Sequence, residues 1–550
     1  MTSMASHFKR PAERPFGRDE RERVTLLFNG LTDTHDCLMG AALEGLGYRA
    51  RPLRIPEKAD FQSGKEYGNT GQCNPTYFTV GNLINELQRL RDEKGLSVDR
   101  IRSDYVFITV GTCGPCRFGM YEAEYRLALR NAGFDGFRVL IFDQVGPREQ
   151  RTAGGGFEVN LQVVTALLDA IFMGDLLNAL FFHVRPYAVD PNALASARQR
   201  CLKVTREALL KPSDRLCPGL WAHALRALLG TQRISDVQQL LHRLRGEDHL
   251  APLRRCREIV AAEVEVDYTR PKPVVKITGE FWAQTTEGEG NYHMFAFLEQ
   301  EGAEVLVEPV ATWVDYLLHS RSVALADRAG LATGEGLERL KSRLRNTRDR
   351  LIVGACERLL TREYDRMRNA LGSTVHPLAN QLEMQRLGHP FYNIRASGGE
   401  GYLEVGKNIY YFNRSLAHMT LSLKPFGCMP STQSDGAQAA VMACYPELNF
   451  LPVETSGEAA VNAYSRVQMS LGEAKAQCKG EFEEAVQRTG RSLEAIRDYV
   501  AEHRALRNPI QTVPAQNGII GRAASFVLHV AALMDREGIP RGSPAERVLA

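Results

Sequence analysis

The sequence contains 550 residues, of which 44% are hydrophobic and 24% are charged, a composition typical of a soluble globular chain with room for two to four domains. Its 68 basic and 65 acidic residues are well mixed and leave a formal net charge of +3, so nothing in the charge pattern indicates a nucleic-acid partner. Residues 1–22 form a polar tail without a signal-peptide core, and the apolar stretch Val159–Phe182 contains Asp169 and Asp175. We therefore expect a cytoplasmic protein without a membrane span.

The pattern of residues 23–150 predicts a first doubly wound α/β lobe. Its expected strands are Arg23–Phe28, Tyr48–Leu53, Tyr105–Val110 and Phe137–Phe142. Helical patterns at Thr34–Leu46 and Tyr77–Asp92 lie between them, so the strands are expected to pair in parallel. A glycine-rich loop, Lys65–Asn74, carries Cys73 directly ahead of the second helix.

Residues 151–270 read as a helical segment, and residues 271–478 predict a second α/β lobe with a helical insertion at about 313–370. The strands expected in this second lobe are Pro273–Trp282, Ala303–Val310, His418–Pro425 and Phe450–Val453. Residues 479–550 are expected to be helical again. The predicted fold class is thus α/β, with two doubly wound, flavodoxin- or Rossmann-like lobes that face each other across a cleft.

A Cys-x-x-Cys pair occupies the turn between a strand and a helix of the first lobe. The strand stops at Gly111, and Cys113-Gly-Pro-Cys116 precedes the helical pattern. In an open α/β sheet this turn lies at the carboxyl end of the strand, where ligands bind, and the amino end of a helix favours a thiolate. The sequence therefore predicts a site of sulfur chemistry here.

The eleven cysteines are odd in number and thinly spread, which does not indicate a disulfide framework. Cys73 precedes a helix, and Cys428 follows a strand of the second lobe as Cys113 and Cys116 do in the first. Cys37, in the first turn after strand one, is a further candidate ligand. We expect Cys444 to point toward the opposite edge of the sheet, and the remaining cysteines to be small buried side chains: Cys201, Cys217, Cys256, Cys356 and Cys478.

Three functions remain open from these residues. Structural zinc usually takes two closely spaced cysteine pairs, and only one is present. A dithiol oxidoreductase using Cys113 and Cys116 would fit the strand-to-helix turn, although Thr112 stands where an aromatic residue is usual. An iron–sulfur site would combine this pair with Cys73, and Cys428 could supply a fourth thiolate. A non-catalytic metal-binding scaffold is the further alternative.

With these residues in view, the chain resembles the activase-related part of the 2-hydroxyacyl-CoA dehydratase and ATP-dependent reductase superfamily. The resembling segments are Gly71–Leu83, Gly111–Tyr121, Gly279–Trp282 and Pro425–Cys428, and Ser456–Glu458 is similar too. The resemblance implies a low-potential cluster, [4Fe–4S] or double-cubane in type, held by Cys73, Cys113, Cys116 and Cys428. It implies a reductase or dehydratase-like activity on a small molecule, with an acyl-CoA as one candidate, and a dimer is a candidate assembly.

The resemblance also implies an ATP-hydrolysing activase that delivers the electron. The chain itself shows no glycine-rich phosphate-binding unit, because Ala396–Gly401 is not preceded by a convincing strand and reads as a loop. The activase is therefore expected to be a separate polypeptide.

Other polar residues are candidates beside the cysteines. Glu287, Glu289 and His293 follow a strand of the second lobe, where a carboxylate and an imidazole could move protons; a solvated turn is the alternative. Arg117, next to Cys116, could donate a hydrogen bond to a cluster sulfide or be an ordinary surface arginine.

Overall fold

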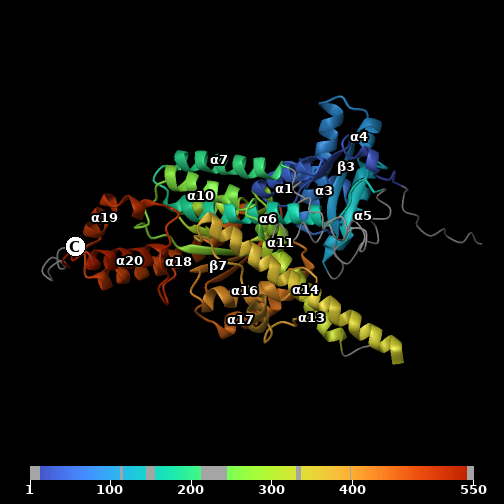
Figure 1. The fold of residues 1–550 in the computed structure, drawn as a ribbon. Coiled ribbons are helices and arrows are strands. Elements are labelled where there is room, and N and C mark those ends of the chain that lie inside the picture. Colours follow the sequence, from blue (N-terminus) through green and yellow to red (C-terminus); the bar gives the residue numbers. More distant parts are fainter. Residues whose placement is uncertain are drawn as a thin grey trace, which may run out of the picture.

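The computed structural model describes residues 13–111, 116–143, 155–211, 245–329, 336–396 and 398–541. Two four-stranded parallel sheets form its α/β framework, with strand orders β2-β1-β3-β4 and β6-β5-β7-β8 (Figure 1). The second order repeats the first, and both match the opening of the flavodoxin-like arrangement. The α/β class with two parallel sheets is thus confirmed, whereas the expectation that two lobes face each other across a cleft stays a prediction.

The first sheet unit follows the expected strands closely. Its strands are β1 (Thr25–Phe28), β2 (Arg49–Pro52), β3 (Tyr105–Gly111) and β4 (Val139–Asp143). Its helices are η1 (Arg18–Glu20), α1 (Asp33–Gly45), α2 (Lys58–Tyr67), α3 (Asn74–Asp92), α4 (Val98–Asp104), η2 (Arg117–Met120) and α5 (Tyr121–Asn131). Strand β1 pairs with β2 and β3, because the intervening helices return the chain in the same direction. Helices α2 and α4 were not expected from the sequence.

The second sheet unit contains the larger insertion. Its strands are β5 (Val274–Gly279), β6 (Glu304–Leu306), β7 (Met419–Pro425) and β8 (Phe450–Thr455). Its helices are α11 (Phe281–Thr285), η4 (Gly288–Asn291), α12 (Met294–Gln300), α13 (Val310–Arg328), α14 (Gly336–Leu371), α15 (Gln381–Gly388), α16 (Tyr402–Asn413), α17 (Met429–Cys444) and α18 (Ala460–Thr489). Every residue of β5 and β7 is buried, as expected for central strands covered on both faces.

The remaining helices share one large apolar core. They are α6 (Leu161–Val184), η3 (Arg185–Tyr187), α7 (Pro191–Leu209), α10 (Ala251–Glu263), α19 (Leu493–Glu502), η5 (Arg504–Arg507) and α20 (Arg522–Arg536). The C-terminal helices lie at the end of the helical segment that is farther from the first sheet (Figure 1), and the Val266 amide donates to Arg507 O at 2.9 Å. Two regions that look separate in the sequence therefore pack as one body.

Helix α6 is the most apolar part of the described chain. The stretch Leu161–Tyr187 is long and apolar enough by composition to cross a membrane, but 56% of its most apolar window is buried within the fold. Its Asp175 carboxylate lies 3.0 Å from Nε2 of His35 on α1. The same carboxylate accepts hydrogen bonds from the amides of Val310 and Ala311 at the start of α13. The helix thus serves as a central packing element, as its interrupting aspartates indicated.

The second sheet unit contains a buried group of three charges. Lys276 lies in the middle of β5 with no exposed surface, and its Nζ is 2.5 Å from Glu308. Lys407 of α16 approaches the same carboxylate at 3.3 Å. Burial lowers the pKa of Lys276 to about 8 even though Glu308 raises it. Isolated charges are costly inside a protein, so each lysine depends on the shared carboxylate.

Candidate functional site

Three of the predicted cysteine ligands stand at the start of a helix. Cys73 caps α3, Cys116 caps η2 after β3, and Cys428 caps α17 after β7. Cys73 and Cys428 are buried and Cys116 is half-buried. Cys113 lies outside the described residues, as does Cys217. A helix start offers unpaired N–H groups that stabilise a negative ligand.

The turns that carry Cys73 and Cys428 touch, although they belong to different sheet units. The Asn74 amide donates to Phe426 O at 3.0 Å. Gly427 has φ +75°, and a Cβ there would lie 3.3 Å from Gln72 O and 3.4 Å from Cys73 Cα. Only glycine takes this conformation at little cost while letting the two backbones approach so closely. The structure therefore brings together two of the predicted ligands from residues more than three hundred positions apart.

The Cys73 loop is also fastened to the helix that follows Cys116. Cys73 Sγ lies 3.1 Å from the Tyr121 hydroxyl on α5, and the buried Glu124 carboxylate accepts hydrogen bonds from Asn69 and Gln72. Arg117, a candidate donor to cluster sulfide or an ordinary surface arginine, donates to the carbonyl of Gly71 in this loop. These contacts hold the Cys73 loop beside the segment that carries Cys116.

Two buried carboxyl groups, Glu280 and Glu400, act on the thiols, and a third, Glu404, lies near these two. Glu280 caps α11 and accepts the Ala283 amide at 2.9 Å, while Glu400 accepts the Phe281 amide at 2.5 Å. Burial raises the pKa of Glu280 to about 7 and holds that of Glu400 well above its usual range. The pKa of Glu404 is also raised by burial, although Lys424 lies 3.3 Å away and opposes the shift. Burial thus favours the protonated form of these carboxyl groups.

The same environment keeps the thiols protonated. Burial, with further repulsion from Glu400 and Glu280, raises the pKa of Cys116 to about 12. Burial followed by the same two carboxyls raises the pKa of the Cys428 thiol, and burial raises that of Cys73. A bound cation reverses this balance, because metal ligation displaces the thiol proton.

Part of the polar surface around the thiols lacks hydrogen-bond partners. Asn74, the residue after Cys73, is buried and its side-chain Nδ2 has no partner among the described residues; the same holds for Glu400 Oε2. Buried polar atoms are normally satisfied, so each of these points to a missing contact. No three described Cys, His, Asp or Glu side chains already stand at metal-binding positions; Cys113 is outside that set.

The other cysteines take different positions. Cys37 is half-buried on α1, and burial raises the pKa of its thiol although Arg206 and Arg198 of α7 oppose the shift. Cys201, Cys256 and Cys478 are buried as expected, but Cys356 is exposed because it lies on the projecting part of α14. Cys444 ends α17 and is exposed, at the far end of the helix that Cys428 begins.

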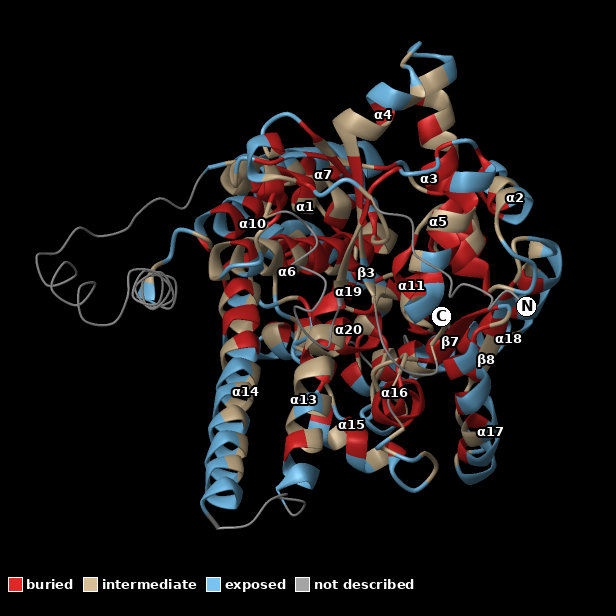
Figure 2. Cartoon of the chain, turned by 90° about the vertical axis from the view of Figure 1, so that its right-hand side faces the viewer, coloured by how far each residue is buried: buried red, intermediate tan, exposed pale blue. Residues whose placement is uncertain are grey.

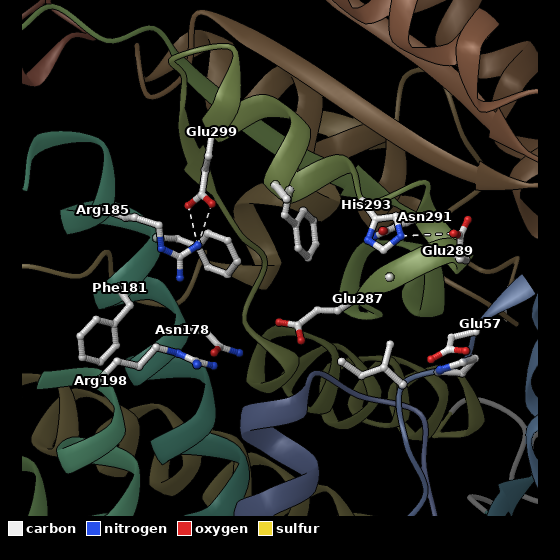
Figure 3. A pocket seen from close by; sticks show the side chains of 16 residues that line it. Glu57, Asn178, Phe181, Arg185, Arg198, Glu287, Glu289, Asn291, His293 and Glu299 are labelled. Atoms are coloured by element: carbon white, nitrogen blue, oxygen red, sulfur yellow. Dashed lines mark hydrogen bonds and ion pairs between the residues drawn. The ribbon is translucent and has the colours of Figure 1, made fainter. Parts of the chain in front are cut away.

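Glu287, Glu289 and His293 line a cavity of about 600 Å³ (Figure 3). Glu289 and His293 form a pair at 3.4 Å and are both solvent-exposed. Glu287 reaches into the cavity toward the α6 and α7 wall, where Arg198 and Arg185 lie. Burial raises the pKa of Glu287. This arrangement places an acid, an imidazole and guanidinium groups around one space.

The turn that carries these residues is strained and tightly held. Tyr292 and His293 both have left-handed backbones, with φ 59° and 50°, which costs about 1–2 kcal/mol for each non-glycine residue. The Tyr292 hydroxyl accepts the Ser456 amide at 2.7 Å, and Tyr464 donates to Tyr292 O at 2.6 Å. Strain that is held in place by surrounding contacts is common at functional sites.

Sequence reasoning missed the carboxyl residues and the arginines of the cavity. Glu280 stands within the Gly279–Trp282 segment, where no local signal marks it as a site residue. Glu400 lies in the loop Ala396–Gly401, and the described residues of that stretch are indeed a loop with glycines at positive φ. Arg185 and Arg198 belong to the helical segment and carry no local signal. Comparisons with family models, curated proteins and solved structures found no match.

Proposed function

We propose that this chain is a cytoplasmic iron–sulfur protein that accepts low-potential electrons from a separate ATP-hydrolysing activase. It acts as a reductase or as a 2-hydroxyacyl-CoA dehydratase-like component. The observation that carries the proposal is the contact between the Cys73 and Cys428 turns, with the Cys116 segment fastened beside them. Thiolates from both sheet units then converge in one place, with the two sheet units as lobes on either side.

The residues around the thiols fit such a centre. Cys73, Cys113, Cys116 and Cys428 would hold a [4Fe–4S] cluster or one half of a double-cubane cluster, which supplies one-electron transfer when bound. The unpaired Nδ2 of Asn74 and the helix-start amides are donors suited to cluster sulfide. Burial raises the pKa of Glu280 to about 7 and that of Glu400 well above its usual range, which reduces the fixed negative charge beside thiolates.

The cavity beside η4 is the proposed place for the small-molecule substrate. Its lining includes Gly288, Glu289 and Asn291 of η4, which follows α11, and Glu280 beside the thiols caps the start of α11. Glu289 and His293 would move protons to and from a bound molecule. Arg198, which donates to the Thr34 hydroxyl at 3.1 Å, would attract a negatively charged group, whereas Arg185 is already paired with Glu299 at 2.7 Å.

Anaerobic purification of the whole chain tests the proposal. We expect brown protein with about four or eight irons per chain and matching sulfide. Cys73→Ser, Cys116→Ser and Cys428→Ser should each lower the iron content, because each removes a thiolate. Cys444→Ser is the matched control, since this cysteine lies on the same helix as Cys428 but at its other end; it should keep full iron.

The alternatives give different results in the same preparation. Stoichiometric zinc without iron would support the metal-binding scaffold, and colourless protein with a titratable dithiol would support the oxidoreductase. Full iron in all three cysteine variants would contradict the ligand assignment. Electron paramagnetic resonance after reduction with a low-potential chemical donor should show a paramagnetic reduced centre in the unmodified chain.

A further inference from the structure

The projecting half of α14 exposes a row of large apolar side chains. Leu337, Leu340, Leu344 and Leu351 are 66%, 53%, 63% and 71% exposed, and Ile352 is 53% exposed. Successive leucines in this row are three, four and seven positions apart in the sequence, which is the spacing of a coiled-coil seam. This leucine row extends over roughly 22 Å of helix. Figure 2 shows this part of α14 exposed on the outside of the molecule.

Among the residues that the structure describes, nothing covers the leucine row, because α14 uses another face to pack on α13. Asn346 Nδ2 donates to Leu325 O of α13 at 3.0 Å. Further along, Glu357 lies 2.9 Å from His319 Nδ1 of α13. At 100° per residue, Asn346 lies on nearly the opposite side of the helix from Leu337 and Leu344. The hairpin of α13 and α14 is therefore complete without these leucines.

Basic residues flank the leucine row on both sides. Residues 337–352 contain six basic side chains, Arg339, Lys341, Arg343, Arg345, Arg348 and Arg350. Only two acidic residues lie in the same stretch, Glu338 and Asp349, and they pair with Lys341 and Arg348 at 3.0 and 2.8 Å. The other four arginines have no carboxylate partner among the described residues. The surface is thus an apolar seam between positively charged flanks.

We propose that the leucine row of α14 binds an amphipathic helix of a partner protein with leucines on its contact face and glutamates or aspartates beside them. An exposed apolar patch of this size marks a protein contact, and flanking charges set partner choice in helix pairs. A second copy of this chain would place arginine flanks against arginine flanks, and this repulsion disfavours self-pairing. An acidic helix satisfies the apolar seam and the charges together.

A labelled peptide and the full chain test this surface. The probe is a fluorescein-labelled 28-residue synthetic helix with leucine at the a and d positions of four heptads and glutamate at e and g. The comparison peptide has lysine at e and g. By fluorescence anisotropy at low salt, the acidic peptide should bind at least about tenfold more tightly than the lysine peptide, and added salt should weaken its binding.

Variants locate the binding on α14. Leu344→Asp should weaken acidic-peptide binding about tenfold or more, because it removes a central apolar contact and adds a like charge. Arg343→Glu should weaken it while leaving the apolar seam intact. Met469→Asp is the matched control, since Met469 is an 80% exposed apolar residue on α18; it should bind the peptide as the unmodified chain does. Circular dichroism melts confirm that each variant is folded.

Four results would overturn the proposal. Equal binding of the two peptides, or binding unaffected by Leu344→Asp, would mean that the seam does not select an acidic helix. A dimer seen by light scattering that Leu344→Asp dissociates would assign the surface to a second copy of the chain. Co-sedimentation with phosphatidylserine vesicles that Leu344→Asp abolishes, without peptide binding, would assign it to a membrane surface.

Discussion

Gly427→Ala probes the contact on which the proposed site depends. Gly427 joins the Cys428 turn to the Cys73 turn, and it adopts a left-handed backbone with φ +75°. An alanine there must bear the left-handed conformation and must also place its Cβ against Gln72 O and Cys73 Cα, at 3.3 and 3.4 Å. We expect the two turns to move apart and the protein to lose both stability and metal.

The expected loss follows from two contributions. The left-handed backbone costs about 1–2 kcal/mol for a residue with a Cβ. Moving the turns apart weakens the 3.0 Å hydrogen bond from the Asn74 amide to Phe426 O, which contributes about 0.5–1.5 kcal/mol. The free energy of unfolding of the metal-free chain should therefore fall by roughly 2–3 kcal/mol in total.

Gly47→Ala separates the two contributions. Gly47 also has a left-handed backbone, with φ +83°, but a Cβ there meets nothing within 4 Å. Urea unfolding of both variants should therefore show Gly427→Ala about 1 kcal/mol less stable than Gly47→Ala. Iron content should fall only in Gly427→Ala. Equal stability and equal iron in the two variants would refute the argument that these turns hold the ligands together.

Three further substitutions test other parts of the fold. Glu308→Gln should lower the free energy of unfolding by about 3–5 kcal/mol, because it leaves two lysines buried without a counter-charge. Glu301→Gln is the control, since Glu301 pairs with a lysine 3.1 Å away at the surface, and it should cost under about 1 kcal/mol. Similar losses in the two variants would contradict the buried network. Burial raises the pKa of Asp36 to about 8, so the folded chain holds a proton that the unfolded chain releases near pH 4, and stability falls as pH rises between these values. Asp36→Asn should therefore raise the melting temperature at pH 8 and change it little at pH 4; the same gain at both pH values would contradict the assignment. Gly174→Ala would press its Cβ against the buried ring of His35 on α1 and should lower the free energy of unfolding by about 1–3 kcal/mol. Gly472→Ala, whose Cβ would meet nothing within 4 Å, should be neutral or stabilising in thermal melts.

The sequence predicted the α/β class because alternating helical and strand-like patterns are local properties. It predicted the placement of Cys73, Cys116 and Cys428 at helix starts for the same reason, since each lies between a turn signal and a helical run. Helices α2 and α4 were missed because their short segments carry weak periodicity.

Tertiary structure decided which of these residues meet. Nothing local indicates that Gly427 packs on Cys73, or that Glu400, in a glycine-rich loop, accepts the amide of Phe281. The same holds for the C-terminal helices, which complete the core of the helical segment. Contacts between residues hundreds of positions apart depend on how whole elements pack, and packing depends on side-chain shape over entire faces. The amino-acid pattern thus determined the parts and the chemistry they carry, and only the packed chain determined their convergence.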